Sequence, residues 1–154
     1  MNEAVDLGLP SGTKWFKYNL GVNYKKLNIN SENSMPEDWY GNYYAWGETE
    51  PNKPKYTLTS YKWKNNKQIT IKYNSTDNLE ELLPEDDAAQ QFNKMLRIPT
   101  VDECLELLNN TNKECVYDYN GIKGLNGYLI SNRKDSNKHI FIPAAGLING
   151  SKRI

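Results

Sequence analysis

The 154-residue sequence has little of what most catalytic and metal sites are built from. One histidine and two cysteines offer few side chains for a zinc site or for a nucleophile paired with an imidazole base. The 19 basic and 19 acidic residues balance, which argues against a basic face for nucleic acid. No apolar run approaches the about 20 residues that span a bilayer, and the glycines stand in turns rather than in a phosphate-binding loop. The composition therefore predicts neither catalysis, nor nucleic-acid binding, nor a membrane span.

The scarce cysteines and histidine each have a structural explanation. Cys104 falls on the apolar stripe of a predicted helix, which favours a packed thiol over a disulfide or a reactive site. Cys115 follows it with no histidine nearby, so no zinc pattern is complete. His139 stands beside an alternating Ile-Phe-Ile segment without a clear serine or cysteine partner. We therefore predict no catalytic residue and no enzyme activity.

What the sequence does have is one well-specified helix. Pro99 closes an extended segment, because the residue before a proline avoids the helical region. Thr100 then stands at the N-cap, and Glu103 three residues later completes a capping box. The apolar residues behind the cap recur with helical spacing and predict one buried stripe, formed by Val101, Cys104, Leu105 and Leu108.

Most of the remaining chain predicts short strands and turns. Alternating apolar residues around Pro10-Ser11-Gly12 indicate an N-terminal hairpin. A second hairpin follows near the C-terminus, and a short acidic helix is expected at residues 85–92. The Asn-rich stretch 21–36 predicts a loop. The expected strands are residues 5–7, 13–20, 68–73, 114–119, 128–132 and 139–142.

The densest aromatic segment, residues 37–49, has two interpretations. A short buried strand with aromatic packing is the simpler one. The functional alternative is a stacking platform for sugars or bases. The side chains of this candidate ligand-binding site are Trp39, Tyr40, Tyr43, Tyr44 and Trp46.

Three consecutive carboxylates also have two interpretations. Glu85, Asp86 and Asp87 offer the hard oxygen ligands that calcium prefers, and they form the candidate metal site. Acidic residues also favour the first turn of a helix, where the macrodipole is positive, so a purely structural role explains them as well. No other cofactor is expected.

Five short motifs occur in an order that resembles a known family. They are Val5-Asp-Leu-Gly-Leu-Pro-Ser-Gly-Thr-Lys-Trp15, Tyr43-Tyr-Ala-Trp-Gly-Glu-Thr49, Pro84-Glu-Asp-Asp-Ala-Ala89, Arg97-Ile-Pro-Thr100 and Phe141-Ile-Pro-Ala-Ala-Gly146. Together they resemble the Fibrobacter succinogenes major paralogous (FISUMP) domain, which is similar to the C-type-lectin-like fold of formylglycine-generating enzymes. The resemblance implies a single α+β domain over residues 1–154, with a small twisted antiparallel sheet, one main helix and long loops.

The chain departs from this family in three places. Members usually continue past the Pro-Ala-Ala-Gly motif, so we expect a sheet that lacks its last strands and has an open edge for a partner chain. Glu50-Pro51-Asn52 matches the calcium-binding tripeptide of mannose-type lectins, but it comes early and lacks their Trp-Asn-Asp strand, which indicates coincidence. The two cysteines are far from the C-terminal pair that formylglycine generation needs.

These features predict a non-enzymatic binding or assembly module. Domains that the chain resembles are often extracellular or carried on phage virions. The first residues show no signal peptide, which favours a virion structural, decoration or host-attachment protein over a secreted one. The alternative is a glycan-binding surface adhesin of a Bacteroidetes-type bacterium, with a formylglycine-type enzyme third. The expected partners are other virion or surface assembly proteins, a second copy in a homo-oligomer, and glycans.

Overall fold

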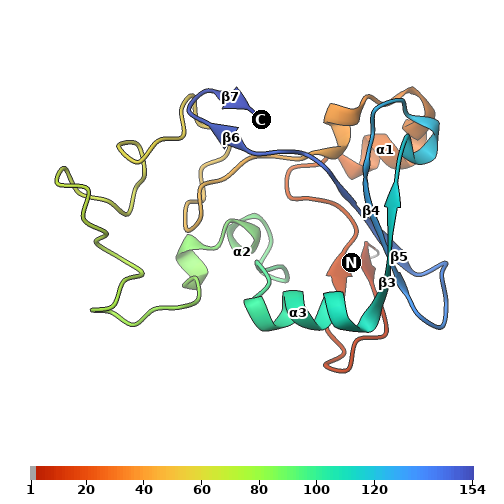
Figure 1. Cartoon of the computed structure of the whole chain (residues 1–154), viewed down its shortest axis with the longest axis horizontal. Helices are drawn as coiled ribbons and strands as arrows, with labels where there is room; N and C mark the ends of the chain where they lie inside the picture. Colours follow the sequence, from red (N-terminus) through yellow and green to blue (C-terminus); the bar gives the residue numbers. More distant parts are fainter. Residues whose placement is uncertain (1–2) are drawn as a thin grey trace. The chain divides into compact units, whose positions relative to one another are not determined.

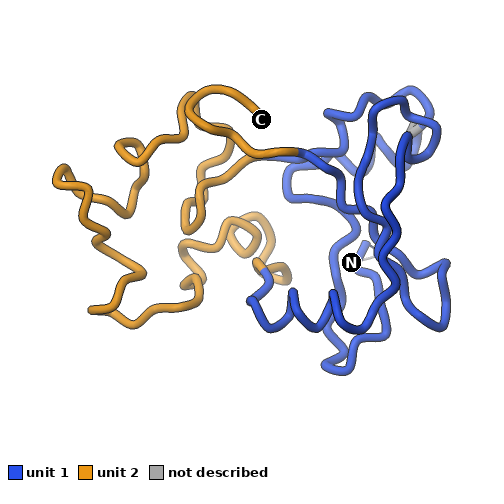
Figure 2. The backbone as a smooth tube through the Cα atoms, viewed as in Figure 1, with its two compact units in different colours: residues 1–42, 99–145 blue, residues 43–98, 146–154 orange. Residues whose placement is uncertain are grey.

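The computed structural model of the chain describes residues 3–154, apart from the side chains of residues 30 and 31. It is a small mixed α/β protein with few helices and several small antiparallel sheets, which confirms the coarse fold class. The chain divides into two compact units (Figure 2). Unit 1 comprises the chain up to Asn42 together with Pro99–Ala145, and unit 2 comprises Tyr43–Ile98 together with Gly146–Ile154. The single domain over residues 1–154 stays a prediction.

Unit 1 holds most of the regular structure (Figure 1). Strands β1 (Ala4–Val5) and β2 (Trp15–Phe16) form the predicted N-terminal hairpin, with Gly12 N–H donating to Leu9 O across its turn. A three-stranded antiparallel sheet has the order β3-β4-β5. Its strands are β3 (Thr111–Val116), β4 (Gly127–Asn132) and β5 (His139–Pro143), so the predicted C-terminal hairpin is confirmed.

Several predictions about strand and loop positions in unit 1 are wrong. The strands expected at residues 5–7 and 13–20 are only two residues long each, as β1 and β2. Residues 21–36 contain helix α1 (Tyr24–Asn30) and the short 3-10 helix η1 (Ser31–Asn33). The Asn23 side chain accepts a hydrogen bond from Lys26 N–H, as an N-cap does, and Leu27 is buried in the core. Strand β3 ends at Val116 rather than at residue 119, because Asp118 adopts a left-handed conformation (φ 50°) that no strand continues through.

Residues 37–49 form no strand, contrary to the prediction. The 3-10 helix η2 (Pro36–Trp39) begins the segment, and the Asp38 carboxylate accepts a hydrogen bond from Met35 N–H. Proline suits the first position of a helix, because its missing N–H would have no partner there. A further 3-10 turn, η4 (Tyr119–Gly121), follows β3.

Apolar clusters cover opposite faces of the β3-β4-β5 sheet. In one, Ile130 and Ile140 are paired across β4 and β5 and pack with Leu7, Leu9 and Leu107. The neighbouring pair, Leu129 and Phe141, points to the other face, because side chains alternate along a strand. Phe141 packs there with Tyr18, Val22, Leu27, Trp39, Ile122 and Leu125.

Helix α3 (Val101–Asn110) begins as predicted but is rotated about its axis. The capping box is present: Glu103 N–H donates to Thr100 Oγ1 at 3.3 Å, and Thr100 N–H donates to Glu103 Oε2 at 2.9 Å. The buried residue is Leu107, whereas Val101, Leu105 and Leu108 are exposed and Cys104 is only half-buried. The predicted stripe is therefore wrong for all but Cys104.

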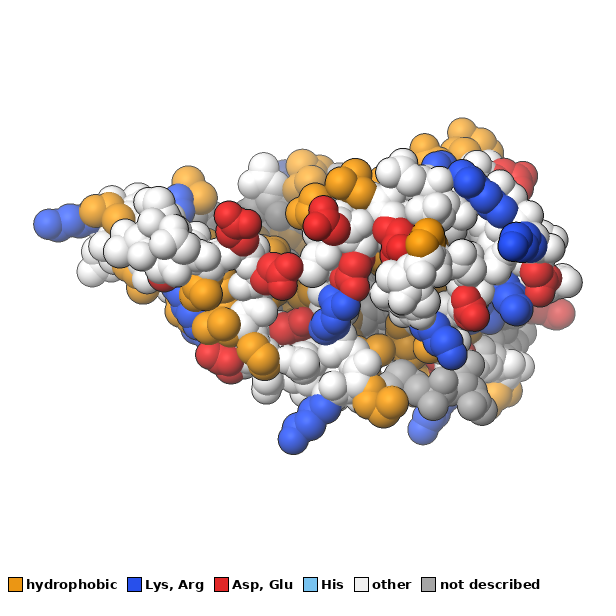
Figure 3. Space-filling model, turned by 90° about the horizontal axis from the view of Figure 1, so that it is seen from below, with side chains coloured by type: hydrophobic (Ala, Val, Ile, Leu, Met, Phe, Trp, Pro, Cys, Tyr) orange, Lys and Arg blue, Asp and Glu red, His pale blue; other side chains and the backbone are white. Residues whose placement is uncertain are grey.

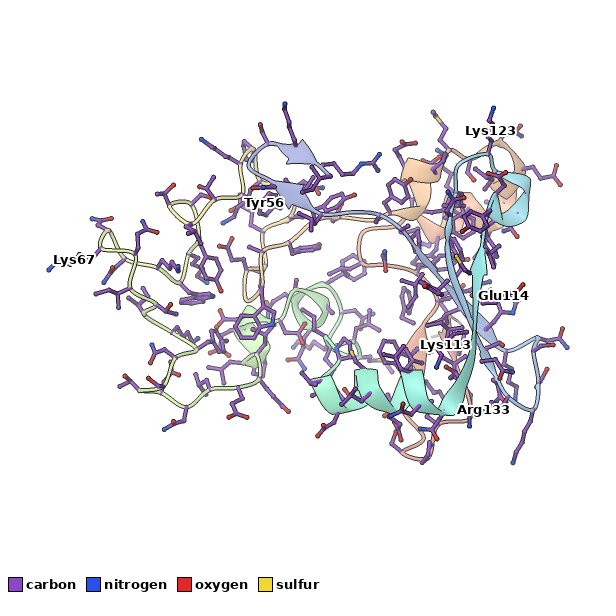
Figure 4. All side chains as sticks on the ribbon, viewed as in Figure 1. Tyr56, Lys67, Lys113, Glu114, Lys123 and Arg133 are labelled. Carbon is purple, nitrogen blue, oxygen red and sulfur yellow. The ribbon has the colours of Figure 1, made fainter. Side chains whose placement is uncertain are left out.

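Polar contacts explain this rotation. Ser11 donates to the Glu106 carboxylate through its N–H (2.8 Å) and its hydroxyl (2.6 Å), which turns that side of α3 toward the N-terminal hairpin. Side chains also donate hydrogen bonds to the backbone carbonyls at the C-terminal end of α3. Two of these donors are cations, Lys113 and Arg133, which the negative end of the helix dipole favours (Figure 4). The donor and acceptor pairs are Asn110 with Glu106, Thr111 with Leu107, Lys113 with Leu108, and Arg133 with Asn109.

A matched pair of variants tests the orientation of α3. Leu107→Ala removes a buried side chain and should lower the free energy of unfolding by about 2 kcal/mol or more, whereas Leu108→Ala should change it by less than about 0.5 kcal/mol. Urea denaturation followed by circular dichroism measures both. Equal losses in the two variants, or a larger loss for Leu108→Ala, would show that the originally predicted stripe faces the core.

Unit 2 has little regular structure. It contains the 3-10 helix η3 (Pro84–Asp86), helix α2 (Ala88–Phe92), and strands β6 (Ile148–Asn149) and β7 (Lys152–Arg153), which pair with each other as an antiparallel hairpin. The predicted short helix at 85–92 is thus confirmed as η3 followed by α2. The predicted strand at 68–73 is reduced to one isolated bridge between Lys64 and Thr70. Long loops make up the rest.

Candidate functional site

The five aromatic side chains of the predicted platform are divided between the two units. Trp39 belongs to unit 1, where it is 7% exposed and its Nε1–H donates to Ser34 Oγ at 3.0 Å. Its ring lies edge-on to Tyr119 and Phe141, so the protein itself contacts the indole. Tyr40 packs against the same cluster. These two residues therefore have a structural role in the core of unit 1.

Tyr43 and Tyr44 are half-buried in unit 2. The backbone of Tyr43 holds the Glu50-Pro51-Asn52 turn: its N–H donates to Asn52 Oδ1 at 2.9 Å, and its carbonyl accepts from Asn52 N–H at 2.8 Å. The Tyr56 hydroxyl donates to the same carbonyl at 2.6 Å. Asn52 adopts a left-handed conformation (φ 50°), as asparagine does in turns. The tripeptide shared with lectins thus has a turn-forming role here.

Trp46 is the exposed member of the set, and it lies next to a residue that the sequence did not single out. Trp46 is 48% exposed, and its ring is edge-on to the ring of Tyr73, with the two ring centroids 4.8 Å apart. The Tyr73 hydroxyl donates to Asp86 Oδ2 at 2.6 Å. Tyr73 therefore joins a predicted aromatic ligand-binding residue to a predicted metal-binding carboxylate.

Asp86 is a buried carboxylate surrounded by donors. It is 2% exposed, and Lys72 Nζ lies 2.5 Å from Oδ2 while Lys62 Nζ lies 3.5 Å from Oδ1. Burial alone would raise the pKa of Asp86, but the hydrogen bonds from Lys72 and Tyr73 and the two lysine charges outweigh it and lower the pKa. The hydrogen bond to Asp86 likewise raises the pKa of Lys72, so the pair stays charged.

The same two lysines lie over the indole of Trp63. Lys62 Nζ is 4.1 Å and Lys72 Nζ is 4.8 Å from the ring centroid, both within the range of cation–π attraction. The Trp63 ring is edge-on to Tyr73 at 5.9 Å, and its Nε1–H donates to Gly47 O at 2.7 Å. Gly47 has φ 72°, and a Cβ there would lie 2.9 Å from Trp63 Nε1, so glycine is required for this contact.

A second buried carboxylate supports the cluster. Glu48, 2% exposed, forms an ion pair with Lys53 and accepts a hydrogen bond from Lys62 N–H at 2.7 Å. The backbone of Lys62 is therefore fixed while its ammonium group remains half-exposed. We call the set Trp46, Lys62, Trp63, Lys72, Tyr73 and Asp86 the aromatic–lysine cluster.

The structure gives the three predicted metal ligands different surroundings. The Glu85 side chain is 65% exposed and lies 3.9 Å from Lys72, whereas Asp86 is charged and ion-paired with Lys62 and Lys72. Asp87 is the N-cap of α2, and its carboxylate accepts from the N–H groups of Ala89, Gln90 and Ile98. Among residues 3–154, no three His, Cys, Asp or Glu side chains are grouped to hold a metal ion. Calcium binding by this triplet stays a prediction.

The two cysteines and the one histidine lie in unit 1. Cys104 and Cys115 are both free thiols; burial, with the charge of Glu103, raises the pKa of Cys104. His139 Nδ1 lies 3.0 Å from Ser136 O at the start of β5. Within the described part of the chain, none of the helices has the length and apolar character needed to cross a membrane.

Sequence reasoning missed Lys62, Trp63, Lys72 and Tyr73. A signal was present, because residues 62–73 combine four lysines with two aromatic and three β-branched residues and contain no acidic residue. Comparison with known proteins adds no relative: no protein-family model, no curated protein and no solved structure matches the chain.

Proposed function

We propose that this chain is a non-enzymatic binding or assembly module with a C-type-lectin-like fold, serving as a phage virion structural, decoration or host-attachment protein. The observation that carries the proposal is the apolar face that α3 leaves exposed. Val101, Leu105 and Leu108 are 76%, 50% and 45% exposed and fall on one side of the helix. Contiguous apolar surface of this kind marks contact sites for other chains, because its burial is favourable.

The sheet of unit 1 supports the same proposal. Cys115, Tyr128 and Ile142 are directly paired across β3, β4 and β5, so they share one face. It is the face that buries Ile130 and Ile140, but beyond that cluster these three side chains are exposed. Tyr117, two residues beyond Cys115, is 72% exposed. Figure 3 shows hydrophobic side chains at the surface among charged ones. Assembly with other protein chains, including a second copy, would remove such side chains from water.

The test replaces the exposed leucines of α3 with a charged residue. The wild-type protein should be oligomeric or co-sediment with virions, and Leu105→Glu/Leu108→Glu should abolish this without changing the circular dichroism spectrum. Ile29→Glu is the matched control, because Ile29 is 87% exposed on a different helix, and it should leave assembly unchanged. A wild-type chain that is strictly monomeric and absent from purified particles contradicts the proposal.

A second candidate function is glycan binding, as a surface adhesin or as the receptor-binding part of a virion. The aromatic–lysine cluster favours it, because Trp46 presents an exposed indole beside Tyr73 and ring faces stack on the C–H faces of sugars. Trp46→Ala should remove binding on a glycan array. The array should be run with and without calcium, since the predicted Glu85–Asp87 site would make binding calcium-dependent. An array without any bound glycan in either condition eliminates this candidate.

A further inference from the structure

The loop that carries most of the aromatic–lysine cluster is strongly basic. Residues 62–73 contain Lys62, Lys64, Lys67 and Lys72 and no acidic residue, although the whole chain has no net charge. Figure 4 shows Lys67 at the tip of this loop. The loop therefore concentrates positive charge that the overall composition conceals.

Hydrogen bonds hold this loop as a narrow hairpin rather than as free chain. Ile71 N–H donates to Trp63 O at 2.9 Å and Asn65 N–H donates to Ile69 O at 3.0 Å. The Asn65 side chain accepts from the N–H groups of Lys67 and Ile69, and Gln68 has φ 61° at the turn. An ordered backbone presents its lysines to a ligand at a lower entropic cost than a disordered one.

The carboxylates near the hairpin are engaged at its base rather than at its tip. Asp86 is shared by Lys72 and Lys62, with the contact to Lys62 the longer one at 3.5 Å, and Glu85 lies 3.9 Å from Lys72. The Lys62 side chain is 50% exposed, so its ammonium can reach a further acceptor. Among the described residues, no ion pair involves Lys64 or Lys67. The hairpin is thus suited to an anionic ligand.

The arrangement of the rings selects among anionic ligands. Single-stranded nucleic acid stacks successive bases on several aromatic rings. Here Trp46 is the one exposed ring of the cluster's three, and two ammonium groups already lie over Trp63. One exposed indole next to several ammonium groups fits a sugar ring followed by carboxylate or sulfate groups.

We infer that the hairpin of residues 62–73, together with Trp46, binds an acidic polysaccharide. In this arrangement Lys62, Lys64 and Lys67 donate charge-assisted hydrogen bonds to its carboxylate or sulfate groups, while Trp46 contacts a sugar ring. The inference rests on the glycan-binding candidate above and names the class of glycan.

Isothermal titration calorimetry with the full chain tests this inference. The probes are oligogalacturonate for carboxylates, dextran sulfate for sulfates, neutral dextran, and single-stranded DNA. The acidic saccharides should bind and dextran should not, and Lys62→Met/Lys67→Met should weaken binding about tenfold or more. Lys25→Met/Lys123→Met removes two exposed lysines of unit 1 and should leave affinity unchanged. Raising the salt concentration should weaken binding of the wild type, because these charges are exposed.

The possible results separate the inference from the proposal beneath it. Equal binding of dextran and the acidic probes, or no effect of the Lys62/Lys67 variant, overturns the acidic ligand but leaves glycan binding standing. If no saccharide binds, either in the calorimetry or on the array, both the inference and the glycan-binding candidate are overturned. Tighter binding of DNA than of either acidic saccharide overturns the inference in favour of nucleic acid. Lys67 makes no ion pair with any described residue, and Lys62 makes the longer of the two lysine contacts to Asp86, so Lys72 still pairs with Asp86 in this variant. Unchanged circular dichroism would exclude misfolding as the cause.

Discussion

Replacing Trp39 by alanine should destabilise unit 1 by about 3–5 kcal/mol, a large share of the stability of a domain of this size. The indole is 7% exposed and contacts Tyr18, Tyr119 and Phe141, so its removal leaves a cavity in the core. It also leaves the buried Ser34 hydroxyl without the indole N–H that it accepts. Hydrogen exchange read by mass spectrometry is the appropriate measurement, because it reports the two units separately.

Trp46→Ala provides the matched control for this prediction. Trp46 is 48% exposed and belongs to unit 2, so its removal should cost less than about 1 kcal/mol and leave amide protection in unit 1 unchanged. The two variants thus divide the aromatic segment into a residue that supports the core and a residue available to a ligand. If Trp39→Ala kept full protection in β4 and β5 while abolishing glycan binding, the burial of Trp39 would be wrong and the original platform would regain support.

Local signals in the sequence predicted local structure well. Thr100 and Glu103 are three residues apart, so their capping box depends on nothing beyond the first turn of α3. The β4–β5 hairpin is likewise predictable, because both strands alternate and a polar loop joins them. The orientation of α3 was not predictable, since it depends on Ser11 bonding to Glu106, 95 residues away. Leucines were available on both sides of the helix, and the side that carries Leu107 is the one that faces the core.

Unit 2 escaped prediction outside its short helix, because side chains rather than periodic backbone pairing hold most of it together. The Asp77 carboxylate alone accepts from the N–H groups of Tyr73, Asn74 and Leu79. Such contacts follow no period of 2 or 3.6 residues, so the pattern at 68–73 suggested a strand that is not there. For the same reason Trp46 and Asp86 were assigned to separate sites: Tyr73, which joins them, is 13 residues from Asp86 in the chain.

Asp86→Asn should destabilise unit 2 by about 3 kcal/mol at neutral pH, because it leaves two ammonium groups and the Tyr73 hydroxyl around an uncharged amide. The expected loss is at the lower end for a buried ion pair, since Lys62 is half-exposed and can be hydrated. Glu85→Gln is the control: it removes the adjacent carboxylate, whose side chain is 65% exposed, and should have little effect. Exchange protection in peptides of η3 and of residues 62–73 measures both.

The pH dependence of this difference gives a sharper test. The folded protein holds the pKa of Asp86 below the value of about 3.9 that an aspartate has in an unfolded chain. Its contribution to stability is therefore complete above that value and is lost as the pH falls through the lower, folded pKa. Backbone hydrogen bonds also lower the pKa values of Asp38 and Asp77. The contributions of these two residues to stability fall in acid by the same amount in wild type and variant. The difference in stability between wild type and Asp86→Asn should thus narrow in acid, and a difference that stays constant from pH 7 to pH 2 would mean that folding does not shift the pKa of Asp86.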